Sequence, residues 1–237
     1  MKNLLLIHGW DYENYAHLQK DDAWKNRNKF LEELKNHYNV YTINLPGFGN
    51  CQEPESNRWN LDDYAKYVDD YIKDNNLKID YLVGYSFGGA VSIRYKTNYE
   101  KIKLVLISPA IVRNVRENTK SFIKTPTFLK GLRNTIRDIY LSHYIKVPEM
   151  KYGTKFLKNT YQSIVREDLV CEIQKFNPND ITIIYGLLDT MVNPKLVINE
   201  VNEDFKKRIF TIKDGSHDIA NTHTKETVEL INDSIKR

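Results

Sequence analysis

Short apolar runs alternate with longer amphipathic stretches along most of this chain. The apolar runs indicate buried strands at 4–7, 40–43, 79–83, 104–107, 181–185 and 208–212. Between them, apolar residues recur at helical spacing over 24–37, 61–72, 87–99, 194–205 and 224–235. Strands that alternate with helices of about 10–15 residues predict an α/β fold, in which a mostly parallel sheet carries helices on both faces.

One segment interrupts this alternation. Residues 111–178 contain no convincing strand, but apolar residues recur at helical spacing over 122–132, 136–144 and 156–170. We interpret the segment as a helical cap or lid, inserted over the carboxyl edge of the sheet. The predicted domain organisation is therefore a core formed by residues 1–110 and 179–237, with a cap insertion at 111–178.

The composition is typical of a globular protein with one domain. The chain has 237 residues, of which 41% are hydrophobic and 28% are charged. No apolar run approaches the roughly 20 residues that span a bilayer, and the run at 4–7 is too short for a signal peptide. We therefore expect a cytoplasmic protein. The cysteines Cys51 and Cys171 lie too far apart in sequence for a zinc motif, and we interpret them as reduced thiols.

Positive charge is concentrated in the central segment. The net charge of +4 is too small to predict a nucleic-acid partner. Residues 111–175, however, contain 13 Lys and Arg against 6 Asp and Glu, a balance of +7. Either these side chains form an ordinary solvated helical surface, or they attract an anionic substrate.

The stretch GYSFGG, Gly84–Gly89, connects the strand at 79–83 to the helix at 87–99. It contains the pattern Gly-x-Ser-x-Gly, which is typical of a nucleophilic serine on a sharp strand-to-helix turn. Such a turn has strained backbone angles and needs small residues two positions before and after the serine. The N-terminus of the following helix stabilises negative charge that develops at the site. Ser86 is thus the candidate nucleophile, and a purely structural turn is the alternative.

A serine nucleophile needs a base, and the base needs an orienting acid. In parallel sheets ligands bind beyond the carboxyl ends of the strands, so both partners should follow strands. Asp189, in GLLD, follows the strand at 181–185, and His217, in KDGSHD, follows the strand at 208–212. The chain order Ser86, Asp189, His217 is the order of nucleophile, acid and base that accompanies this turn. We predict these three residues as the catalytic triad.

Other acids and histidines fit these roles less well. Asp180 precedes its strand and so falls on the wrong edge of the sheet. Asp214 and Asp218 are close to His217 in sequence, and the side chain of such a close neighbour rarely points at the ring nitrogen that the acid has to bind. His223 is the one serious rival base and falls near the start of the last helix. The remaining histidines that do not follow a strand are interpreted as surface or partly buried residues: His17, His37 and His143.

When a serine nucleophile attacks a carbonyl group, the carbonyl oxygen becomes an oxyanion, and two backbone N–H groups must stabilise it. One is expected from Phe87, directly after the serine. The other is expected from Trp10, in the turn IHGW after the first strand, where Gly9 permits a close approach of the chain. We interpret His8 as a structural residue that shapes this turn.

Together these motifs resemble those of the α/β-hydrolase-fold serine hydrolases. HGW resembles the oxyanion turn of that family, GYSFGG its nucleophile elbow, and GLLD and GSHD its acid and histidine loops. NLPGFGNC resembles the family loop D-x-P-G-x-G-x-S, with Asn44 in place of Asp and Cys51 in place of Ser. The likeness covers residues 2–109 and 179–237. It implies a six-stranded sheet without the family's first two strands, in the order second, first, third, fourth, fifth and sixth along this chain.

The resemblance implies hydrolysis of carboxylic esters with small or medium acyl groups, through an acyl-enzyme and with no metal or organic cofactor. The expected partner is a small-molecule acyl ester, and apolar side chains of the cap would line its acyl pocket. Two alternatives stay open. The basic cap suggests an acyl thioesterase that acts on an anionic carrier, and some proteins of this fold bind small molecules without catalysis. Serine at position 86 argues against a dehalogenase, which would need aspartate there.

Overall fold

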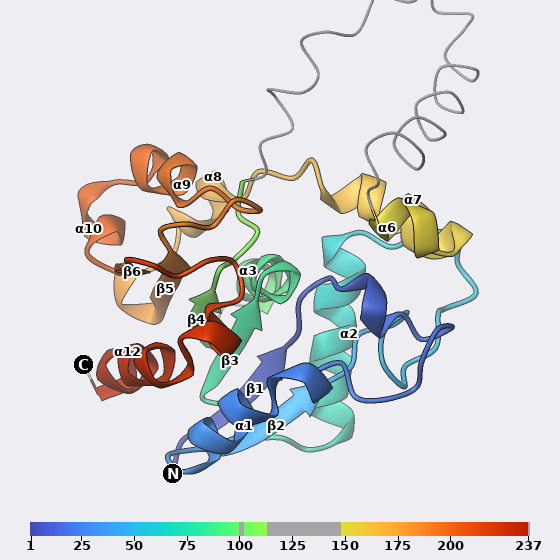
Figure 1. The fold of residues 1–237 in the computed structure, drawn as a ribbon, viewed down its shortest axis with the longest axis horizontal. Coiled ribbons are helices and arrows are strands. Elements are labelled where there is room, and N and C mark those ends of the chain that lie inside the picture. Colours follow the sequence, from blue (N-terminus) through green and yellow to red (C-terminus); the bar gives the residue numbers. More distant parts are fainter. Residues whose placement is uncertain (100–101, 113–147, 237) are drawn as a thin grey trace, which may run out of the picture.

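A six-stranded parallel sheet forms the centre of the computed structural model, which describes residues 1–99, 102–112 and 148–236 (Figure 1). All neighbouring strands pair in parallel. Their order is β2-β1-β3-β4-β5-β6, which confirms the order expected from the sequence. The strands are β1 Asn3–Ile7, β2 Asn39–Ile43, β3 Tyr81–Tyr85, β4 Lys103–Ile107, β5 Ile181–Gly186 and β6 Ile209–Ile212.

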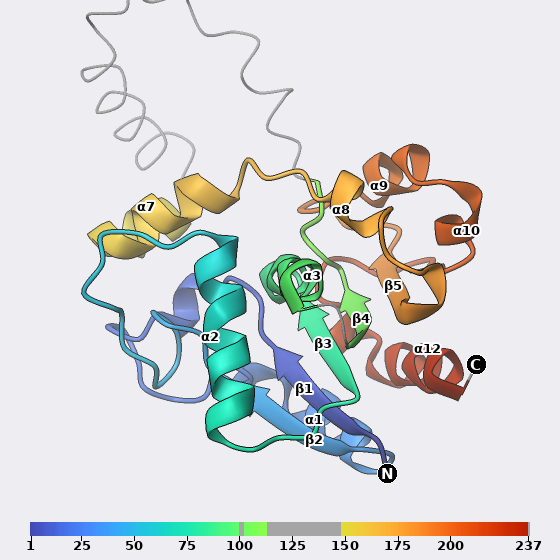
Figure 2. The same cartoon turned by 180° about the vertical axis from the view of Figure 1, so that it is seen from behind.

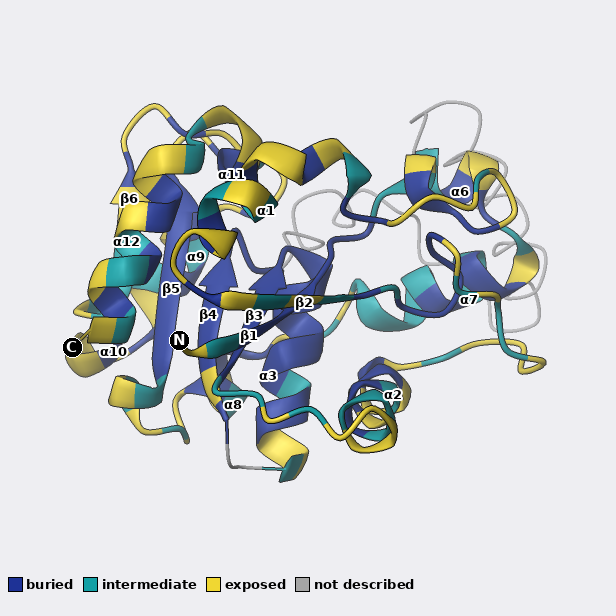
Figure 3. Cartoon of the chain, turned by 90° about the horizontal axis from the view of Figure 1, so that it is seen from below, coloured by how far each residue is buried: buried dark blue, intermediate teal, exposed yellow. Residues whose placement is uncertain are grey.

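Helices cover both faces of the sheet, as predicted. Helices α1, α11 and α12 lie on one face, and α2, α3 and α8 lie on the other (Figure 3). Residues of β1 alternate between the two sides: Leu5 and Ile7 join the core under α2 and α3, whereas Leu4 and Leu6 join the core under α1 and α12. None of the described helices is both long and apolar enough to cross a membrane. The helices of the two flanks are α1 Asn28–Lys35, α2 Leu61–Asp74, α3 Phe87–Tyr99, α9 Pro194–Glu200, α10 Glu203–Lys206, α11 Ile219–Thr222 and α12 Thr224–Lys236.

The described residues between β4 and β5 form short helices. Two of them, α6 and α7, lie beyond the carboxyl ends of the strands, near the start of α2 (Figures 1 and 2). Thr160 of α7 accepts a hydrogen bond from the backbone N–H of Trp59 at 2.9 Å. The helices expected at 122–132 and 136–144 lie outside the described residues, and the division into core and cap stays a prediction. The bounds are α6 Pro148–Tyr152, α7 Lys155–Ile164, α8 Val170–Ile173 and the 3-10 turn η4 Pro178–Asp180.

An ionic cluster fixes α8 and the chain before it against α3. Arg94 of α3 contacts Asp62 at 3.2 Å, Glu167 at 2.7 Å and Glu172 at 2.8 Å. Burial raises the pKa of Glu167, and the Arg94 cation opposes that rise. Because Phe87 begins α3, the cluster holds the returning end of the inserted segment against the helix that follows Ser86.

Three predicted helices differ from the observed ones. The helix expected over 156–170 ends at Ile164, the last residue of α7, and α8 begins separately at Val170. The helix expected over 24–37 begins only at Asn28, after the 3-10 turn η2 Lys25–Arg27, because Arg27 has backbone angles of φ −127° and ψ 29°, outside the helical region. The helix expected over 194–205 is interrupted at Val201, which is extended. The Asn202 side chain then accepts hydrogen bonds from two backbone N–H groups and starts α10 as a separate helix.

Candidate active site

Ser86 occupies a strained turn between β3 and α3. Its φ of +51° is left-handed, a region that residues other than glycine rarely adopt. Neighbouring backbone holds this conformation on both sides. The Ser86 N–H donates to Ile107 O at 2.9 Å, and the Ser86 carbonyl accepts from the N–H of Ala110 at 3.0 Å. The strand β3 runs to Tyr85, two residues further than predicted, so the turn begins at Ser86 itself.

The glycines of this turn are there because other chain segments pass very close. A Cβ atom at Gly88 would lie 2.1 Å from Ile7 O and 2.6 Å from His8 O. A Cβ atom at Gly84 would lie 2.5 Å from Gly88 O. These neighbours are backbone atoms, which cannot rotate away. The first helical turn of α3 can therefore lie directly beside the end of β1.

The structure brings Ser86, His217 and Asp189 together. His217 Nε2 lies 3.0 Å from Ser86 Oγ, and His217 Nδ1 lies 2.7 Å from Asp189 Oδ2. The Asp189 side chain is fully buried, and the His217 side chain is 14% exposed. The three residues predicted from three separate strand ends thus form one continuous hydrogen-bonded chain.

Backbone donors hold the other oxygen of Asp189. Its Oδ1 accepts hydrogen bonds from the N–H groups of Met191 at 2.8 Å and Val192 at 2.9 Å. These bonds satisfy a buried carboxylate and leave Oδ2 directed at His217. Because the carboxylate only accepts, His217 Nδ1 carries the hydrogen and Nε2 presents a lone pair to Ser86.

The rival acids and the rival base are engaged elsewhere. Asp180 lies in η4, before β5, and contacts Lys96 Nζ at 3.4 Å. His223 Nε2 pairs with Asp214 at 3.3 Å. Asp218 pairs with Arg27 at 3.1 Å. Within the described residues, no hydrogen bond or ion pair joins the side chains of these rivals to Ser86, Asp189 or His217.

The remaining histidines also lie away from Ser86. His17 Nε2 lies 3.0 Å from the carbonyl oxygen of Tyr152. The His37 ring packs against Tyr38 with ring centroids 6.2 Å apart. His143 falls outside the described residues.

The two residues expected to form the oxyanion hole lie side by side. The rings of Trp10 and Phe87 pack edge to face with centroids 5.2 Å apart, and the Trp10 indole donates to Tyr15 Oη at 2.8 Å. These contacts fix the two aromatic side chains. No hydrogen bond from either backbone N–H to an acceptor occurs among the described residues.

His8 shapes the turn after β1. Its Nε2 accepts a hydrogen bond from the N–H of Leu45 at 3.0 Å, so Nδ1 carries the ring hydrogen and donates to Gly9 O at 2.8 Å. Burial lowers the pKa of His8 to about 4, and the bond to Gly9 opposes this shift only in part. A neutral His8 therefore joins the turn at Gly9 to the loop after β2.

Sequence reasoning missed two features near Ser86. The Tyr85 ring packs on His217 with centroids 5.6 Å apart. Ser108, at the end of β4, has a left-handed φ of +44° and a buried hydroxyl without a hydrogen-bond partner among the described residues. The dipeptide Ser108-Pro109 does not predict the left-handed angle, because a residue before proline ordinarily adopts extended backbone angles.

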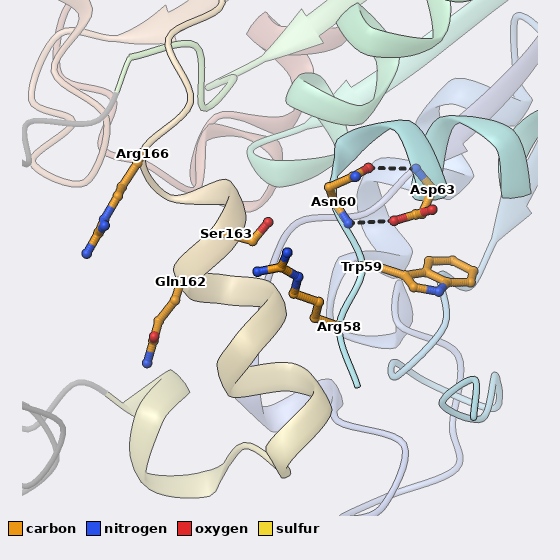
Figure 4. Close-up of a pocket in the computed structure, with 7 residues that line it drawn as sticks. All are labelled: Arg58, Trp59, Asn60, Asp63, Gln162, Ser163 and Arg166. Atoms are coloured by element: carbon orange, nitrogen blue, oxygen red, sulfur yellow. Dashed lines mark hydrogen bonds between the residues drawn. The ribbon is translucent and has the colours of Figure 1, made fainter. Parts of the chain in front are cut away.

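A groove of about 380 Å³ lies between α7 and the start of α2 (Figure 4). Asn60 and Asp63 cap α2 reciprocally, at 3.0 Å and 2.8 Å. Arg58 extends toward α7 (Figure 4), and neither it nor Arg166 forms an ion pair with any residue that the structure describes. The groove lining is Arg58, Trp59, Asn60, Asp63, Gln162, Ser163 and Arg166.

A much smaller void of about 10 Å³ borders Phe87. Leu61 and Ile164 line it, and these residues directly follow Asn60 and Ser163 of the groove. The void and the groove therefore lie against the same two chain segments. Within the described part of the chain, no group of three or more His, Cys, Asp or Glu is arranged to hold a metal ion.

Comparison with known proteins places this chain in a family. A model described as "Alpha/beta hydrolase family" matches residues 4–178. The chain belongs to the alpha/beta hydrolase family. The matched range contains Ser86 and the turn after β1, whereas Asp189 and His217 lie beyond it and are linked to Ser86 by the hydrogen bonds given above.

Curated relatives of this alpha/beta hydrolase include esterases. A "Putative esterase/lipase 2" of Mycoplasma pneumoniae is 25% identical, over 90% of this chain and 81% of the relative. A "Pimeloyl-[acyl-carrier protein] methyl ester esterase" of Pseudoalteromonas atlantica is 28% identical, over 45% of this chain and 38% of the relative.

Solved structures share the fold. A bromoperoxidase from Bacillus anthracis is similar with a TM-score of 0.67 and 22% identity, covering 100% of this chain and 92% of that one. An esterase from Exiguobacterium antarcticum is similar with a TM-score of 0.63 and 16% identity, over the same shares of the two chains. At these identities the likeness concerns the fold.

Two residues depart from the usual family loop, and both have structural partners. Asn44 Oδ1 accepts from the N–H of Ala23 at 2.9 Å, and Asn44 Nδ2 donates to Asn50 at 2.8 Å. The Cys51 thiol lies 3.2 Å from the Tyr67 hydroxyl. An amide at position 44 thus connects the loop after β2 to the chain before α1.

Proposed function

We propose that this alpha/beta hydrolase is a serine esterase that cleaves carboxylic esters of small or medium acyl groups through an acyl-enzyme. The observation that carries the proposal is the continuous chain of contacts from Ser86 Oγ through His217 to Asp189, at 3.0 Å and 2.7 Å. Such a chain is the arrangement that activates a serine hydroxyl.

In the proposed first step Ser86 Oγ attacks the carbonyl carbon of the ester. His217 Nε2 takes the hydroxyl proton and then gives it to the leaving alcohol, which departs as the acyl-enzyme forms. Asp189 keeps the imidazole in the required tautomer and stabilises its positive charge. Its own orientation is maintained by the bonds from Met191 and Val192.

The backbone N–H groups of Trp10 and Phe87 are the proposed donors to the tetrahedral oxyanion. One good donor of this kind contributes roughly 3–4 kcal/mol to the stability of the transition state. In the second step His217 takes a proton from water, whose oxygen attacks the acyl carbon. Collapse of that intermediate releases the carboxylic acid, and the proton returns to Ser86.

The relatives support ester chemistry. The relative from Mycoplasma pneumoniae that matches most of the chain is named as an esterase/lipase. Its name does not specify an acyl group, so the proposed size range rests on the expected apolar lining of the acyl pocket.

A thioesterase acting on an anionic carrier is a second candidate, and a specific observation favours it. Arg58 and Arg166 line the groove between α2 and α7. The two chain segments that carry them also border the small void next to Phe87. The name of the relative from Pseudoalteromonas atlantica includes an acyl-carrier protein. An acidic carrier docked at the groove would be attracted by both guanidinium groups.

Hydrolysis of p-nitrophenyl esters with increasing acyl length tests the proposal. We expect turnover of short or medium esters by the wild type, and a loss of roughly 10⁶-fold in kcat for Ser86→Ala. Turnover of carrier-bound thioesters alone would favour the second candidate. In that case Arg58→Glu should lower kcat/KM for the carrier substrate more than for a free thioester. A folded wild type without any turnover would indicate a binding protein.

A further inference from the structure

Arg27 is a buried cation behind the loop that carries His217. It ends the 3-10 turn η2, and its side chain is only 10% exposed. Its Nε donates to Asp218 Oδ1 at 3.1 Å, across 191 positions of the sequence. Because Asp218 directly follows His217, this ion pair anchors the chain next to the proposed base.

The same guanidinium packs on the residue that precedes Ser86. Arg27 Cζ lies 4.4 Å from the centroid of the Tyr85 ring. The Tyr85 ring also packs on His217, at 5.6 Å between centroids and an interplanar angle of 43°, and on Trp24 at 6.5 Å. A Cβ atom at Gly9 would come within 2.8 Å of the Tyr85 ring, so the turn after β1 confines it as well.

A buried arginine has a desolvation cost that an ion pair seldom recovers as net stability. Burial lowers the pKa of Arg27, but its interactions with Tyr85, Asp218 and Asp11 outweigh that effect and keep the group charged. The arrangement therefore points to a geometric role rather than to a gain in stability. Arg27 contacts Tyr85, which precedes Ser86, and Asp218, which follows His217.

We propose that Arg27 is a positioning residue for the reaction at Ser86. It holds the His217 imidazole within reach of the hydroxyl by fixing Asp218 on one side and the Tyr85 ring on the other. This inference rests on the proposed serine esterase function. Arg27 contacts no reacting atom. Without it, the 3.0 Å separation of His217 Nε2 and Ser86 Oγ is populated less often, so kcat falls while KM changes little.

Ester hydrolysis normalised to the serines titrated with a fluorophosphonate tests the proposal. We expect Arg27→Ala to lower kcat per titrated serine about 10- to 100-fold, with KM changed less than about threefold. Arg27→Lys keeps the charge but lacks the planar group that stacks on Tyr85, so an intermediate kcat is expected. Asp218→Asn removes only the ion pair and replaces Arg27→Ala as the test variant if that variant does not fold. We expect Asp218→Asn to lower kcat per titrated serine about tenfold.

Lys96 provides a matched control. Its side chain is 5% exposed, and it pairs with Asp180 at 3.4 Å and donates to Ile102 O at 2.8 Å, at the amino edge of the sheet. We expect Lys96→Ala to lower Tm without lowering kcat per titrated serine. If Arg27→Ala has the same result, with a lower Tm and unchanged kcat per titrated serine, Arg27 is only structural and the proposal is wrong.

A measurement without turnover separates this inference from the esterase proposal. The ¹H NMR signal of the hydrogen on His217 Nδ1, assigned by its absence in His217→Ala, reports the bond to Asp189. We expect Arg27→Ala to broaden or remove this signal through faster exchange with water, and Lys96→Ala to retain it. An unchanged signal in Arg27→Ala would overturn the inference. If the wild type has no esterase activity, the esterase proposal fails and this comparison still decides the role of Arg27.

Discussion

His217 Nε2 lies 3.0 Å from Ser86 Oγ, although 131 positions separate the two residues in sequence. Ser86 follows β3 and His217 follows β6, and two strands, β4 and β5, lie between them in the sheet. The loop after β6 therefore has to reach back across the carboxyl edge. Asp189, in the loop after β5, accepts a hydrogen bond from His217 and so supports the loop after β6 where it crosses this edge. The contact depends on both loops at once, which makes it sensitive to single substitutions.

Asp189→Asn should nearly abolish catalysis without unfolding the protein. The amide keeps the shape of the carboxylate, but its NH₂ group facing His217 would favour the tautomer with the hydrogen on Nε2. That nitrogen could then no longer accept the Ser86 proton. We expect kcat for a p-nitrophenyl ester to fall about 10⁴-fold, with Tm close to that of the wild type. A loss of less than about tenfold would contradict the assigned role of Asp189.

Substitution of the two candidate bases should give opposite results. His217→Ala removes the group that contacts Ser86, and we expect a loss of roughly 10⁶-fold in kcat. His223 pairs instead with Asp214, so His223→Ala should keep kcat within about twofold of the wild type. Parallel kinetics of the two variants check this. A comparable collapse of activity in both would show that the base was assigned wrongly.

His8 should make stability depend on pH. Its pKa is about 4 in the folded protein and near its ordinary value of 6.5 when unfolded, so the unfolded chain binds a proton first as pH falls. The free energy of unfolding should therefore decrease by roughly 3 kcal/mol between about pH 7 and about pH 4, with no further loss from this group below that range. Urea unfolding across this range measures the change.

His8→Gln is the control for this pH dependence, because glutamine can still accept from the Leu45 N–H but does not titrate. It should be less stable than the wild type at neutral pH and lose less stability on acidification. If the wild type and His8→Gln lose equal stability between about pH 7 and about pH 4, the buried histidine is not the cause.

Gly88→Ala should disrupt the fold around Ser86. The added methyl group would meet Ile7 O at 2.1 Å, and the backbone of β1 cannot move without breaking its pairing with β3. We expect a destabilisation of at least about 3 kcal/mol, seen as a lower Tm or a loss of folded protein. A Tm within about 2 °C of the wild type would show that α3 does not pack as closely on β1 as described.

The parts of the fold that follow local patterns could be predicted from the sequence. The helix α3 has the bounds expected for it, Phe87–Tyr99, because a glycine-rich turn precedes an unbroken helical pattern. Asp189 and His217 could be selected because parallel strands bring the residues after their carboxyl ends to one edge. Ser86 could be selected because its turn requires glycine on both sides.

Other features depend on contacts that leave no local pattern. Nothing in the residues around Arg27 indicates that its side chain pairs with Asp218, 191 positions away. The break between α9 and α10 was also missed, because apolar residues keep helical spacing through Val201 while Asn202 caps the next helix. A side chain that hydrogen-bonds to backbone N–H groups can end one helix and start another without changing the apolar periodicity.

Labelling with a fluorophosphonate probe shows whether Ser86 is an activated nucleophile, because the probe reacts covalently with a serine activated by a neighbouring base. We expect one adduct per chain, found by mass spectrometry on the peptide that contains Ser86. Labelling should be absent in Ser86→Ala and strongly slowed in His217→Ala. Absence of labelling in the folded wild type, or equal labelling of Ser86→Ala, would show that Ser86 is not the activated nucleophile.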